Sequence, residues 1–481
     1  MNRRMVFNTT GKIVLSEAAM LLLPVIVALI YGEKCVYSLL ISAGIALVCG
    51  LLLMLIFRPQ NKVIYAREGF AIVALAWLLL SAIGALPFTL SGEIPRYIDA
   101  FFETVSGFTT TGASIIENVE KMSHGLLFWR SFTHWVGGMG ILVFAIAILP
   151  GVSERSIHIL RAEMPGPIVG KLVPRAKNTA RVLYIIYFVL TALEIVLLLA
   201  GGMSFFESVV HSFGTAGTGG FGIKADSIAS YSPYLQWVIT VFMLLFGINF
   251  NLYFLMLIGR FREAIKSTEL WVYLGIVFAA ALVIFFNIYP LYGNVAEVAR
   301  LSGFQVASII TTTGYATADF NQWPELSRNI LLLLMFFGAC AGSTGGGFKI
   351  SRVVILVKSL YRELVALVSP RSVRVVRFEG KRLDENALHS VSGYFIVYVI
   401  CFILILLMLA FDDFDFLTNF SAAASCLNNI GPGLNAVGPA SNYSAYSTFS
   451  KLVLSFAMLF GRLEIYPMLL TLSPKAWIKK R

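Results

Sequence analysis

The run TTTGYA, residues 311–316, lies between two strongly apolar segments, and a second run that begins with the same four residues, TTTGAS, occupies residues 109–114. One polar run between apolar segments is typical of an ordinary loop. Two such runs in one chain indicate a repeated structural element with a repeated role. The fold therefore depends on what flanks each copy.

The flanking sequence is that of a membrane protein. The chain has 481 residues, of which 58% are hydrophobic and 13% charged, and its mean hydropathy is +0.81. This composition excludes a soluble globular protein. About ten stretches are long enough to cross a bilayer as helices: residues 16–31, 36–57, 70–90, 131–150, 182–200, 235–258, 270–289, 329–357, 393–410 and 451–472. We therefore predict an all-α integral membrane protein whose first helix is retained, because no signal-peptide cleavage site follows it.

Four shorter apolar segments, residues 98–108, 205–213, 295–310 and 414–427, can enter a membrane but cannot cross it. Each precedes a glycine-containing polar run: TTTGAS (109–114), TAGTGGFG (215–222), TTTGYA (311–316) and NNIGPGL (428–434). The pattern predicts four pseudo-symmetric repeats of helix, re-entrant pore loop and helix around a central pore, after two N-terminal helices.

The predicted divisions follow from this pattern. They are an N-terminal two-helix region (1–68), pore repeat 1 (69–150), a cytoplasmic loop with pore repeat 2 (151–259), pore repeat 3 with a broken second helix (260–366), and a cytoplasmic loop with pore repeat 4 (367–481).

The polar runs have a physical constraint in common. Irregular backbone at membrane depth is tolerated only where it is buried in protein or lines a watery cavity, so the four runs should converge on one axis. Glycine permits backbone angles that turn carbonyl oxygens inward, and each short helix would direct its negative carboxyl end toward its run. Such an arrangement predicts a site for a dehydrated cation, like the carbonyl rings of potassium channels.

The runs TTTGAS, TGGFG, TTTGYA and NNIGPG resemble those of the Trk/Ktr/HKT superfamily of potassium transporters, and with the two extra N-terminal spans they are most similar to the membrane subunit of bacterial Trk systems. The resemblance covers essentially the whole chain and implies potassium uptake through a filter with one glycine per repeat. In the second repeat this glycine is Gly220 or its neighbour Gly219. The filter residues that the resemblance implies are Thr110, Thr111, Gly112, Thr218, Gly219, Gly220, Thr312, Thr313, Gly314, Asn429, Ile430 and Gly431. Gly112 favours potassium, because a serine at this position in the plant branch is associated with sodium permeation.

A glycine-rich segment, GACAGSTGGGFK at residues 338–349, interrupts the eighth predicted span. A continuous helix would not choose it, since each glycine costs about 1 kcal/mol relative to alanine. The resemblance implies a flexible intramembrane gate, whereas the alternative is a small-residue packing surface between helices. The gate residues are Gly338, Gly342, Ser343, Thr344, Gly345, Gly346, Gly347 and Lys349.

Arg462 lies inside the last span, where a charge is costly and usually faces a cavity or a partner. The resemblance places a basic residue here near the pore axis, beneath the filter, where it would raise the barrier to cations. The alternative is a structural salt bridge, for example with Glu194.

The charges predict the orientation. With the N-terminus in the cytoplasm, 28 of the 37 lysine and arginine residues fall on the inner side, as the positive-inside rule requires. We therefore expect a multi-pass protein of the bacterial inner membrane with both termini cytoplasmic. The five cysteines are scattered and indicate no disulfide framework.

The resemblance also implies partners. It predicts a homodimer and a separate cytosolic regulatory subunit of the RCK (KTN) type, which binds NAD(H) or ATP, since no such domain is found in this chain. The basic segments 171–181 and 370–382 suit contact with lipid headgroups. No nucleic-acid partner is expected, and K⁺ is expected only as the transported ion.

Two alternatives come from the same residues. One is a sodium-permeable protein, or a sodium- or proton-coupled potassium symporter, of the same fold. The other is a membrane enzyme, but no acid/base, nucleophile or metal-ligand constellation supports it.

Overall fold

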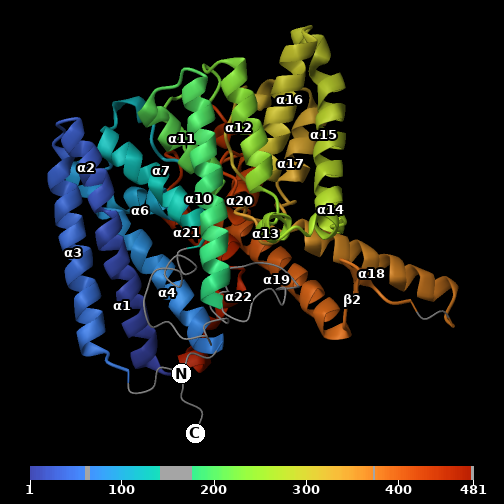
Figure 1. Cartoon of the computed structure of the whole chain (residues 1–481), viewed down its shortest axis with the longest axis horizontal. Coiled ribbons are helices and arrows are strands. Elements are labelled where there is room, and N and C mark those ends of the chain that lie inside the picture. The colour runs from blue at the N-terminus through green and yellow to red at the C-terminus, as the bar shows by residue number, and fades with distance from the viewer. Residues whose placement is uncertain (60–65, 141–175, 372–373, 478–481) are drawn as a thin grey trace.

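The computed structural model describes residues 1–59, 66–140, 176–371 and 374–477, and nearly all regular structure in these ranges is helical (Figure 1). Within the same ranges the only strands are β1 (Arg377–Phe378) and β2 (Lys381–Arg382), which pair as an antiparallel hairpin. The prediction of an all-α membrane fold is confirmed.

The N-terminal region consists of α1 (Arg3–Met20), α2 (Leu22–Ile30) and α3 (Cys35–Ile56). The first span starts at Arg3, well before the predicted residue 16, because a cap and not hydropathy sets its beginning: the Asn2 side chain accepts a hydrogen bond from the Met5 N–H at 3.2 Å. Helices α1 and α3 approach closely at Gly11 and Gly50, where a methyl group on Gly50 would lie 2.7 Å from Leu15.

Four units follow, each with a long first helix and a short second one. The long helices are α4 (Ala66–Gly84), continued by α5 (Leu86–Ser91), then α10 (Ala176–Ala200), α15 (Thr268–Tyr292) and α19 (Glu385–Leu409). The short helices are α6 (Tyr97–Phe108), α11 (Phe205–Gly217), α16 (Val295–Ile310) and α20 (Phe416–Leu427). The boundaries of the four predicted repeats stay a prediction.

The helix after each polar run is interrupted or stops early. These helices are α7 (His124–Gly138), α12 (Pro233–Phe246) with α13 (Phe250–Leu257), α17 (Glu325–Leu334) with α18 (Ile350–Val368), and α21 (Thr448–Arg462) with α22 (Tyr466–Leu472). The short remaining elements are α14 (Phe261–Ile265), α23 (Pro474–Trp477) and the 3₁₀ turns at Val119–Lys121, Phe320–Gln322 and Asn435–Val437.

The sequence predicted a break only in the third repeat, and for the second and fourth repeats this was wrong. Helices α12 and α13 are bent by 87°, and Asn249 starts α13 by accepting a hydrogen bond from the Asn251 N–H at 2.9 Å. Pro467 occupies the first turn of α22 and cannot continue α21. In the first repeat α7 ends at Gly138, and residues 141–150 of the predicted span lie outside the described residues.

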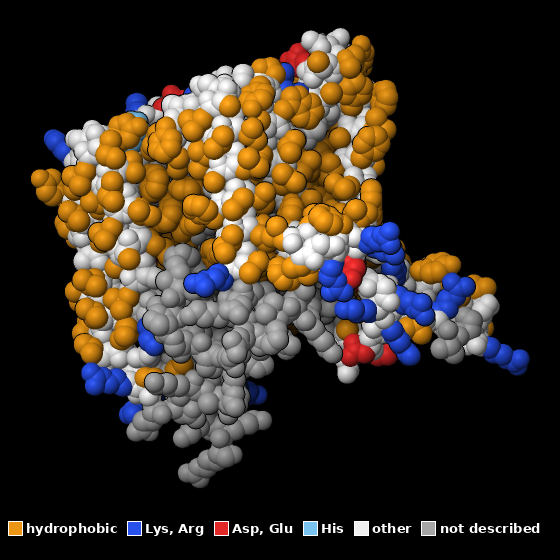
Figure 2. Space-filling view, in the orientation of Figure 1, with side chains coloured by type: hydrophobic (Ala, Val, Ile, Leu, Met, Phe, Trp, Pro, Cys, Tyr) orange, Lys and Arg blue, Asp and Glu red, His pale blue; other side chains and the backbone are white. Residues whose placement is uncertain are grey.

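Because of these breaks, six helices in the described ranges are long and apolar enough to cross a membrane, or seven if the bent pair forms one span. The other spans among the ten predicted consist of shorter pieces. Large side chains such as Phe278 (70% exposed) and Phe286 (67%) face outward from α15. Figure 2 shows hydrophobic side chains over most of this face, with lysine and arginine gathered along its lower edge and around α18. A bilayer suits such a surface.

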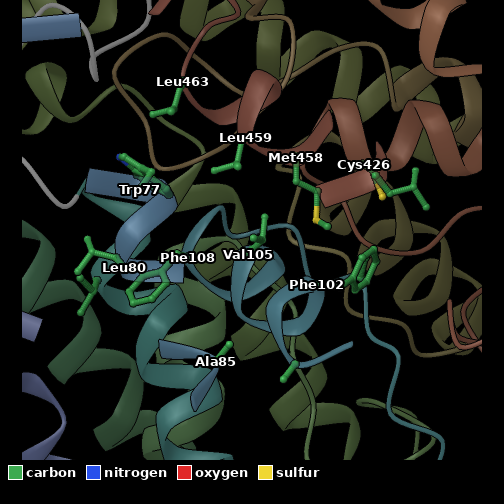
Figure 3. Packing of buried hydrophobic residues seen from close by; sticks show 14 of the residues in the cluster. Trp77, Leu80, Ala85, Phe102, Val105, Phe108, Cys426, Met458, Leu459 and Leu463 are labelled. Atoms are coloured by element: carbon green, nitrogen blue, oxygen red, sulfur yellow. The ribbon is translucent and has the colours of Figure 1, made fainter. Parts of the chain in front are cut away.

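The core packs the short helix α6 against distant parts of the chain. Figure 3 shows Phe102, Val105 and Phe108 of α6 in one hydrophobic cluster with Trp77 of α4 and Met458 of α21. All five side chains are almost completely buried. The first short helix is therefore held by both the beginning and the end of the chain, which fixes the position of the TTTGAS run that follows it.

Candidate functional site

Three of the four short helices begin with a side-chain cap, whereas Arg96 before α6 makes no capping hydrogen bond. Ser204 accepts a hydrogen bond from the Glu207 N–H (3.3 Å) at the start of α11, and Asn294 does the same for the Ala296 N–H (3.0 Å) at α16. Asp415 caps α20 through the Thr418 N–H at 3.1 Å, and hydrogen bonding from the Thr418 hydroxyl lowers the pKa of Asp415. These caps fix where the three helices start.

All four short helices end with the same hydrogen bonds. The N–H groups of Thr111, Gly219, Thr313 and Ile430 each donate to the carbonyl five residues earlier, at 2.8–2.9 Å. The preceding residues, Thr110, Thr218, Thr312 and Asn429, have φ between 55° and 59° and donate to the carbonyl three residues earlier, at 3.0–3.4 Å. This pair of bonds is a Schellman motif, and it occurs four times at equivalent places. The polar runs thus have one backbone conformation as well as similar sequences.

Three of the left-handed residues in these motifs are threonines, where glycine is the usual choice. A β-branched residue with positive φ is strained, and such strain gathers at functional sites. Thr312 uses its hydroxyl to accept a hydrogen bond from the Gly346 N–H at 2.7 Å. Asn429, the fourth, donates to the Thr111 hydroxyl (3.0 Å) and to the Met458 carbonyl (2.9 Å).

The glycine two residues further on closes a ring. Gly112, Gly220, Gly314 and Gly431 all have positive φ. A methyl group on Gly112 would overlap the carbonyl oxygen of Gly219; the equivalent groups on Gly220 and Gly314 would overlap those of Thr313 and Ile430, and one on Gly431 would lie 2.7 Å from that of Thr111. Each repeat therefore touches the next in chain order, and the fourth touches the first. The structure brings all twelve predicted filter residues into this ring.

The ring also distinguishes the two candidate glycines of the second repeat. Gly220 occupies the position equivalent to the other three glycines, since it has φ +70° and contacts the third repeat. Gly219 instead faces His134, whose ring atoms a methyl group there would overlap. His134 is held by a 2.7 Å hydrogen bond between its Nδ1 and the Gly107 carbonyl.

Two cavities flank the ring. The first, which we call the glycine cavity, is lined by Gly112, Gly220, Gly314 and Gly431. The second, the loop cavity, is lined by glycines 345–347 together with Gly138, Lys349 and Arg462. The ring lies between the two cavities. Its four glycines line the first, and Gly346, which lines the second, contacts Thr312 and Asn429 of the ring.

The glycine-rich segment is seated against the ring. Besides the bond from Gly346 to Thr312, a methyl group on Gly345 would lie 3.0 Å from the Thr311 carbonyl oxygen, and one on Gly346 would lie 2.7 Å from the Asn429 Cβ. The glycines are therefore needed for close approach. The segment and the ring share one hydrogen-bonded contact surface.

The break in α12–α13 accommodates the same segment. The Cys340 N–H donates to the Gly247 carbonyl at 3.1 Å, and the Phe250 N–H donates to the Gly342 carbonyl at 3.0 Å. These backbone groups are free for the segment only because the helix is interrupted there. At its own base the segment closes with a bond from the Gly338 N–H to the Phe348 carbonyl at 2.8 Å.

Arg462 connects three parts of the site. Its guanidinium donates to the carbonyls of Thr344 (2.7 Å), Gly137 (2.5 Å) and Gly138 (2.7 Å). Lys349, fully buried nearby, donates to the carbonyl of Gly345. Two positive charges thus border the loop cavity directly beneath the ring. Of the predicted gate residues, Thr344, Gly345, Gly346, Lys349 and Arg462 bond to one another or to the ring here.

Glu194, the partner suggested for Arg462 in the salt-bridge alternative, does not pair with it: both carboxylate oxygens of Glu194 lack a hydrogen-bond partner within the described ranges. Glu464, two positions beyond Arg462, pairs instead with Arg352 of α18. Glu464 lies in the break between α21 and α22, and it lines the loop cavity together with Arg462.

Sequence reasoning missed a buried ion pair behind the ring. Glu103 of α6 and Arg130 of α7 meet at 2.6 Å, and both are buried. Glu103 also accepts hydrogen bonds from the Ser114 hydroxyl (3.0 Å) and the Ile115 N–H (2.9 Å), and Arg130 donates to the Gly222 carbonyl at 2.9 Å. The pair thus fixes the backbone just beyond the first two ring glycines. Its signal was available: one acidic and one basic residue within apolar segments.

Glu103→Gln is expected to destabilise the protein, because it leaves Arg130 buried without its counter-charge, at a cost of about 3–5 kcal/mol. The thermal unfolding midpoint in detergent measures this. The matched control is Glu325→Gln, which removes a surface partner of Arg328 and should cost about 0–1 kcal/mol. Equal midpoints for the two variants would contradict the structural role of the pair.

Among the described residues, no group of three or more His, Cys, Asp or Glu side chains is placed to hold a metal ion. What the site offers is backbone carbonyl oxygen, hydroxyl groups, two flanking cavities and a positively charged base. A helical membrane body with four short helices directed at one such ring defines a class: a membrane transport protein for cations.

Comparison with known proteins gives the family. A family model described as a cation transport protein, TrkH, matches residues 40–480. The chain is 36% identical to the Trk system potassium uptake protein TrkH of Escherichia coli (strain K12), over 99% of this chain and 100% of that protein. It is 34% identical to the Trk system potassium uptake protein TrkG of the same organism, over 98% of both. The crystal structure of the potassium transporter TrkH from Vibrio parahaemolyticus superposes with a TM-score of 0.90 at 33% identity, covering 99% of this chain and 100% of that chain.

The chain therefore belongs to the TrkH family of Trk system potassium uptake transporters. The resemblance read from the polar runs is confirmed. The relatives are named as transporters, which also confirms that the chain is not an enzyme.

Proposed function

We propose that the protein carries K⁺ into the cell through the four-repeat ring. The observation that supports this most is the closure of the ring: four glycines, each with positive φ, each against a carbonyl of the next repeat. The named relatives are potassium uptake proteins. The twelve ring residues, from Thr110 to Gly431, would form the filter, with K⁺ as the transported ion.

The chemistry of the ring suits a monovalent cation. Each short helix directs its partially negative carboxyl end toward the ring, and the carbonyl oxygens there can replace the water shell of the ion. The hydroxyls of Thr111 and Thr313 are each engaged at 2.8 Å by the hydroxyl two residues earlier, which fixes the backbone between them. Glycine at position 112 favours K⁺ over Na⁺ in this proposal.

The glycine-rich segment serves as the gate of this pathway. It covers the inner side of the ring, and Lys349 and Arg462 add positive charge there, so the arrangement described is a closed one. Conduction requires the segment to move away from Thr312 and Asn429. The gate set is Gly338, Gly342, Ser343, Thr344, Gly345, Gly346, Gly347, Lys349 and Arg462.

We also propose a regulatory partner and a dimeric assembly for this protein. The relatives' Trk system names imply partner proteins in general. We propose that the partner is a separate cytosolic RCK/KTN-type subunit that carries NAD(H) or ATP, and that two copies of this chain form a homodimer. Helix α18 projects from the body with exposed side chains such as Leu364, Leu367 and Val368 (Figure 1), which suits such contacts. Of the basic segment 171–181, residues 171–175 lie outside the described residues.

The orientation follows the charges. The N-terminus and helix α22 lie at the end of the body where lysine and arginine gather on the face shown in Figure 2. By the positive-inside rule this end is cytoplasmic. The protein would thus span the bacterial inner membrane with the glycine cavity outward and the loop cavity inward.

The test of this function is growth of a potassium-uptake-deficient bacterium at low external K⁺, with and without the protein. We expect rescue, and uptake of Rb⁺ that excess Na⁺ does not block. Na⁺ entry without rescue would make the sodium-permeable alternative correct. Rescue that requires external Na⁺ or a proton gradient would identify a coupled symporter.

Deleting glycines 345–347 is expected to raise Rb⁺ flux by about tenfold, because a barrier near 1.4 kcal/mol is then removed from the inner side of the ring. Purified protein in vesicles, without any partner, measures this directly. Unchanged flux through a well-folded variant would mean that the segment is a packing surface and not a gate.

A further inference from the structure

We infer that Glu269 is a positioning residue that clamps the gate segment shut, and that the β1–β2 hairpin holds Glu269 in place. No part of the filter chemistry requires this residue. The inference rests on the proposed gating role of residues 338–349. It adds a connection between the gate and the cytoplasmic side of the protein.

One carboxylate oxygen joins the two arms of the gate segment. Glu269 lies in the first turn of α15, and its Oε1 accepts hydrogen bonds from the Ala341 N–H at 2.7 Å and the Ser351 N–H at 3.0 Å. Ala341 lies near the start of the gate segment, and Ser351 lies just after its end. Glu269 is only 4% exposed, and it lines a cavity together with Glu263 and Glu379. While both bonds persist, the arms cannot separate.

The bond to Ser351 takes the place of a missing cap. Lys349 is the residue before α18, and its side chain makes no capping hydrogen bond to that helix. The N–H groups at a helix start need an acceptor, and a negative charge there is favourable. Here the acceptor comes from another helix, so α18 can start in this position only while α15 stays beside it.

The hairpin anchors the clamp in turn. Glu379, in the turn between β1 and β2, accepts hydrogen bonds at 3.0 Å from the Ser267 hydroxyl and from the N–H of Glu269 itself. Ser267 is the cap of α15. On its other side the hairpin is tied to α18, because the Lys358 ammonium donates to the Arg377 carbonyl at 3.0 Å. Glu379 therefore connects the hairpin to the clamp through two bonds.

This geometry gives a route from the cytoplasmic side to the ring. Helix α18 projects sideways from the body, with β2 beneath it (Figure 1). A partner that tilts α18 or pulls the hairpin would move Ser351 and the first turn of α15 relative to each other. The bonds at Glu269 would then break, and the segment that contacts Thr312 would be released.

The test compares Glu269→Ala with Glu269→Gln in vesicles that contain the protein alone. The amide oxygen of glutamine can still accept both hydrogen bonds, whereas alanine removes the acceptor. We expect Glu269→Ala to raise Rb⁺ flux by about tenfold, and Glu269→Gln to stay within about twofold of the unmodified protein. Glu379→Ala should raise flux in the same direction by a smaller factor. Glu263→Ala is the matched control, because Glu263 lines the cavity beside Glu269 and Glu379 but is exposed and pairs with Arg260.

Two native cysteines report on structure independently of flux. Cys340 lies in the gate segment and Cys426 lies in α20, and both are fully buried. Maleimide labelling followed by mass spectrometry should show faster modification of Cys340 in Glu269→Ala, with Cys426 unchanged. Labelling of both would mean that Glu269 supports the whole fold, and this would overturn the inference.

These outcomes distinguish failure of the inference about Glu269 from failure of the proposed function on which it rests. If deletion of glycines 345–347 raises Rb⁺ flux but Glu269→Ala leaves both flux and Cys340 labelling unchanged, the gate stands and the clamp is wrong. If Glu269→Gln raises flux as much as alanine does, the charge and not the acceptor matters, and the clamp is again wrong. If Rb⁺ flux is absent even from the deletion variant, the proposed function fails and the inference fails with it.

Discussion

A serine in place of Gly314 is expected to remove most of the preference for Rb⁺ over Na⁺. Gly314 has φ +85°, and a Cβ there would overlap the Ile430 carbonyl oxygen of the fourth repeat. The carbonyl must move, and the ring opens between the third and fourth repeats. A displacement that costs the K⁺ site about 1.4 kcal/mol relative to Na⁺ lowers the selectivity ratio by about tenfold. Competition between Rb⁺ and Na⁺ in vesicle uptake measures the ratio.

The control is Gly293→Ser. Gly293 also has positive φ, at the end of α15, but no atom lies within 4 Å of the position of its missing Cβ. Its serine variant therefore carries the same backbone strain without the clash. Similar selectivity in Gly314→Ser and the unmodified protein would remove the third run from the filter. A loss in Gly293→Ser as well would mean that backbone strain alone explains the effect.

Replacing Arg462 by alanine is expected to raise the Rb⁺ flux of the protein without partners. The substitution removes the hydrogen bonds that hold the gate segment at Thr344 and the end of α7 at Gly137 and Gly138. It also removes a positive charge from the inner side of the ring. Hydrogen bonds from a charged group contribute about 1.5–3 kcal/mol each, so a flux increase of about tenfold or more is expected.

Arg462→Lys separates the two causes. Lysine keeps the charge but lacks the planar fork that reaches Thr344 and Gly137 together. Flux that rises in both variants would identify the hydrogen bonds as the barrier, and flux that rises only with alanine would identify the charge. Arg260→Ala, at an exposed position, is the control. Unchanged flux in Arg462→Ala would exclude Arg462 from the gate.

Much of the ring could be predicted from sequence because its signals are local. A short apolar segment followed by a glycine in a polar run indicates a half-length helix and a loop, and the run TTTG repeats almost unchanged. The choice between Gly219 and Gly220 could not be made, since two adjacent glycines give the same local signal. Only contact with the third repeat and with His134 distinguishes them.

The breaks outside the third repeat were missed for a different reason. Mean hydropathy through α12–α13 stays high, so residues 235–258 appear to be one span. The contact that stabilises the bend comes from a residue far away in the sequence: the Cys340 N–H donates a hydrogen bond to the Gly247 carbonyl. Two residues mark the breaks locally. Asn249 caps α13 after the break in the second repeat, and Pro467 lies in the first turn of α22 after the break in the fourth repeat.

Long-range ties between charged groups were the least predictable part of the site. The partners Glu103 and Arg130 are 27 positions apart, with the first polar run and its loop between them, and Glu269 contacts residues more than seventy positions away. No periodicity or motif encodes such pairs. What sequence does show is that a carboxylate lies within or beside an apolar segment, which marks it as a residue whose partner must be found in three dimensions.

The central claim is that the four-glycine ring selects K⁺. The most direct measurement is Rb⁺ uptake into vesicles containing the purified protein, with increasing Na⁺ or K⁺ as competitor, in the variant that lacks glycines 345–347 so that the gate does not limit flux. The account predicts that K⁺ displaces Rb⁺ and that Na⁺ at the same concentration does not. Equal displacement by Na⁺ and K⁺ would show that the ring does not select between them.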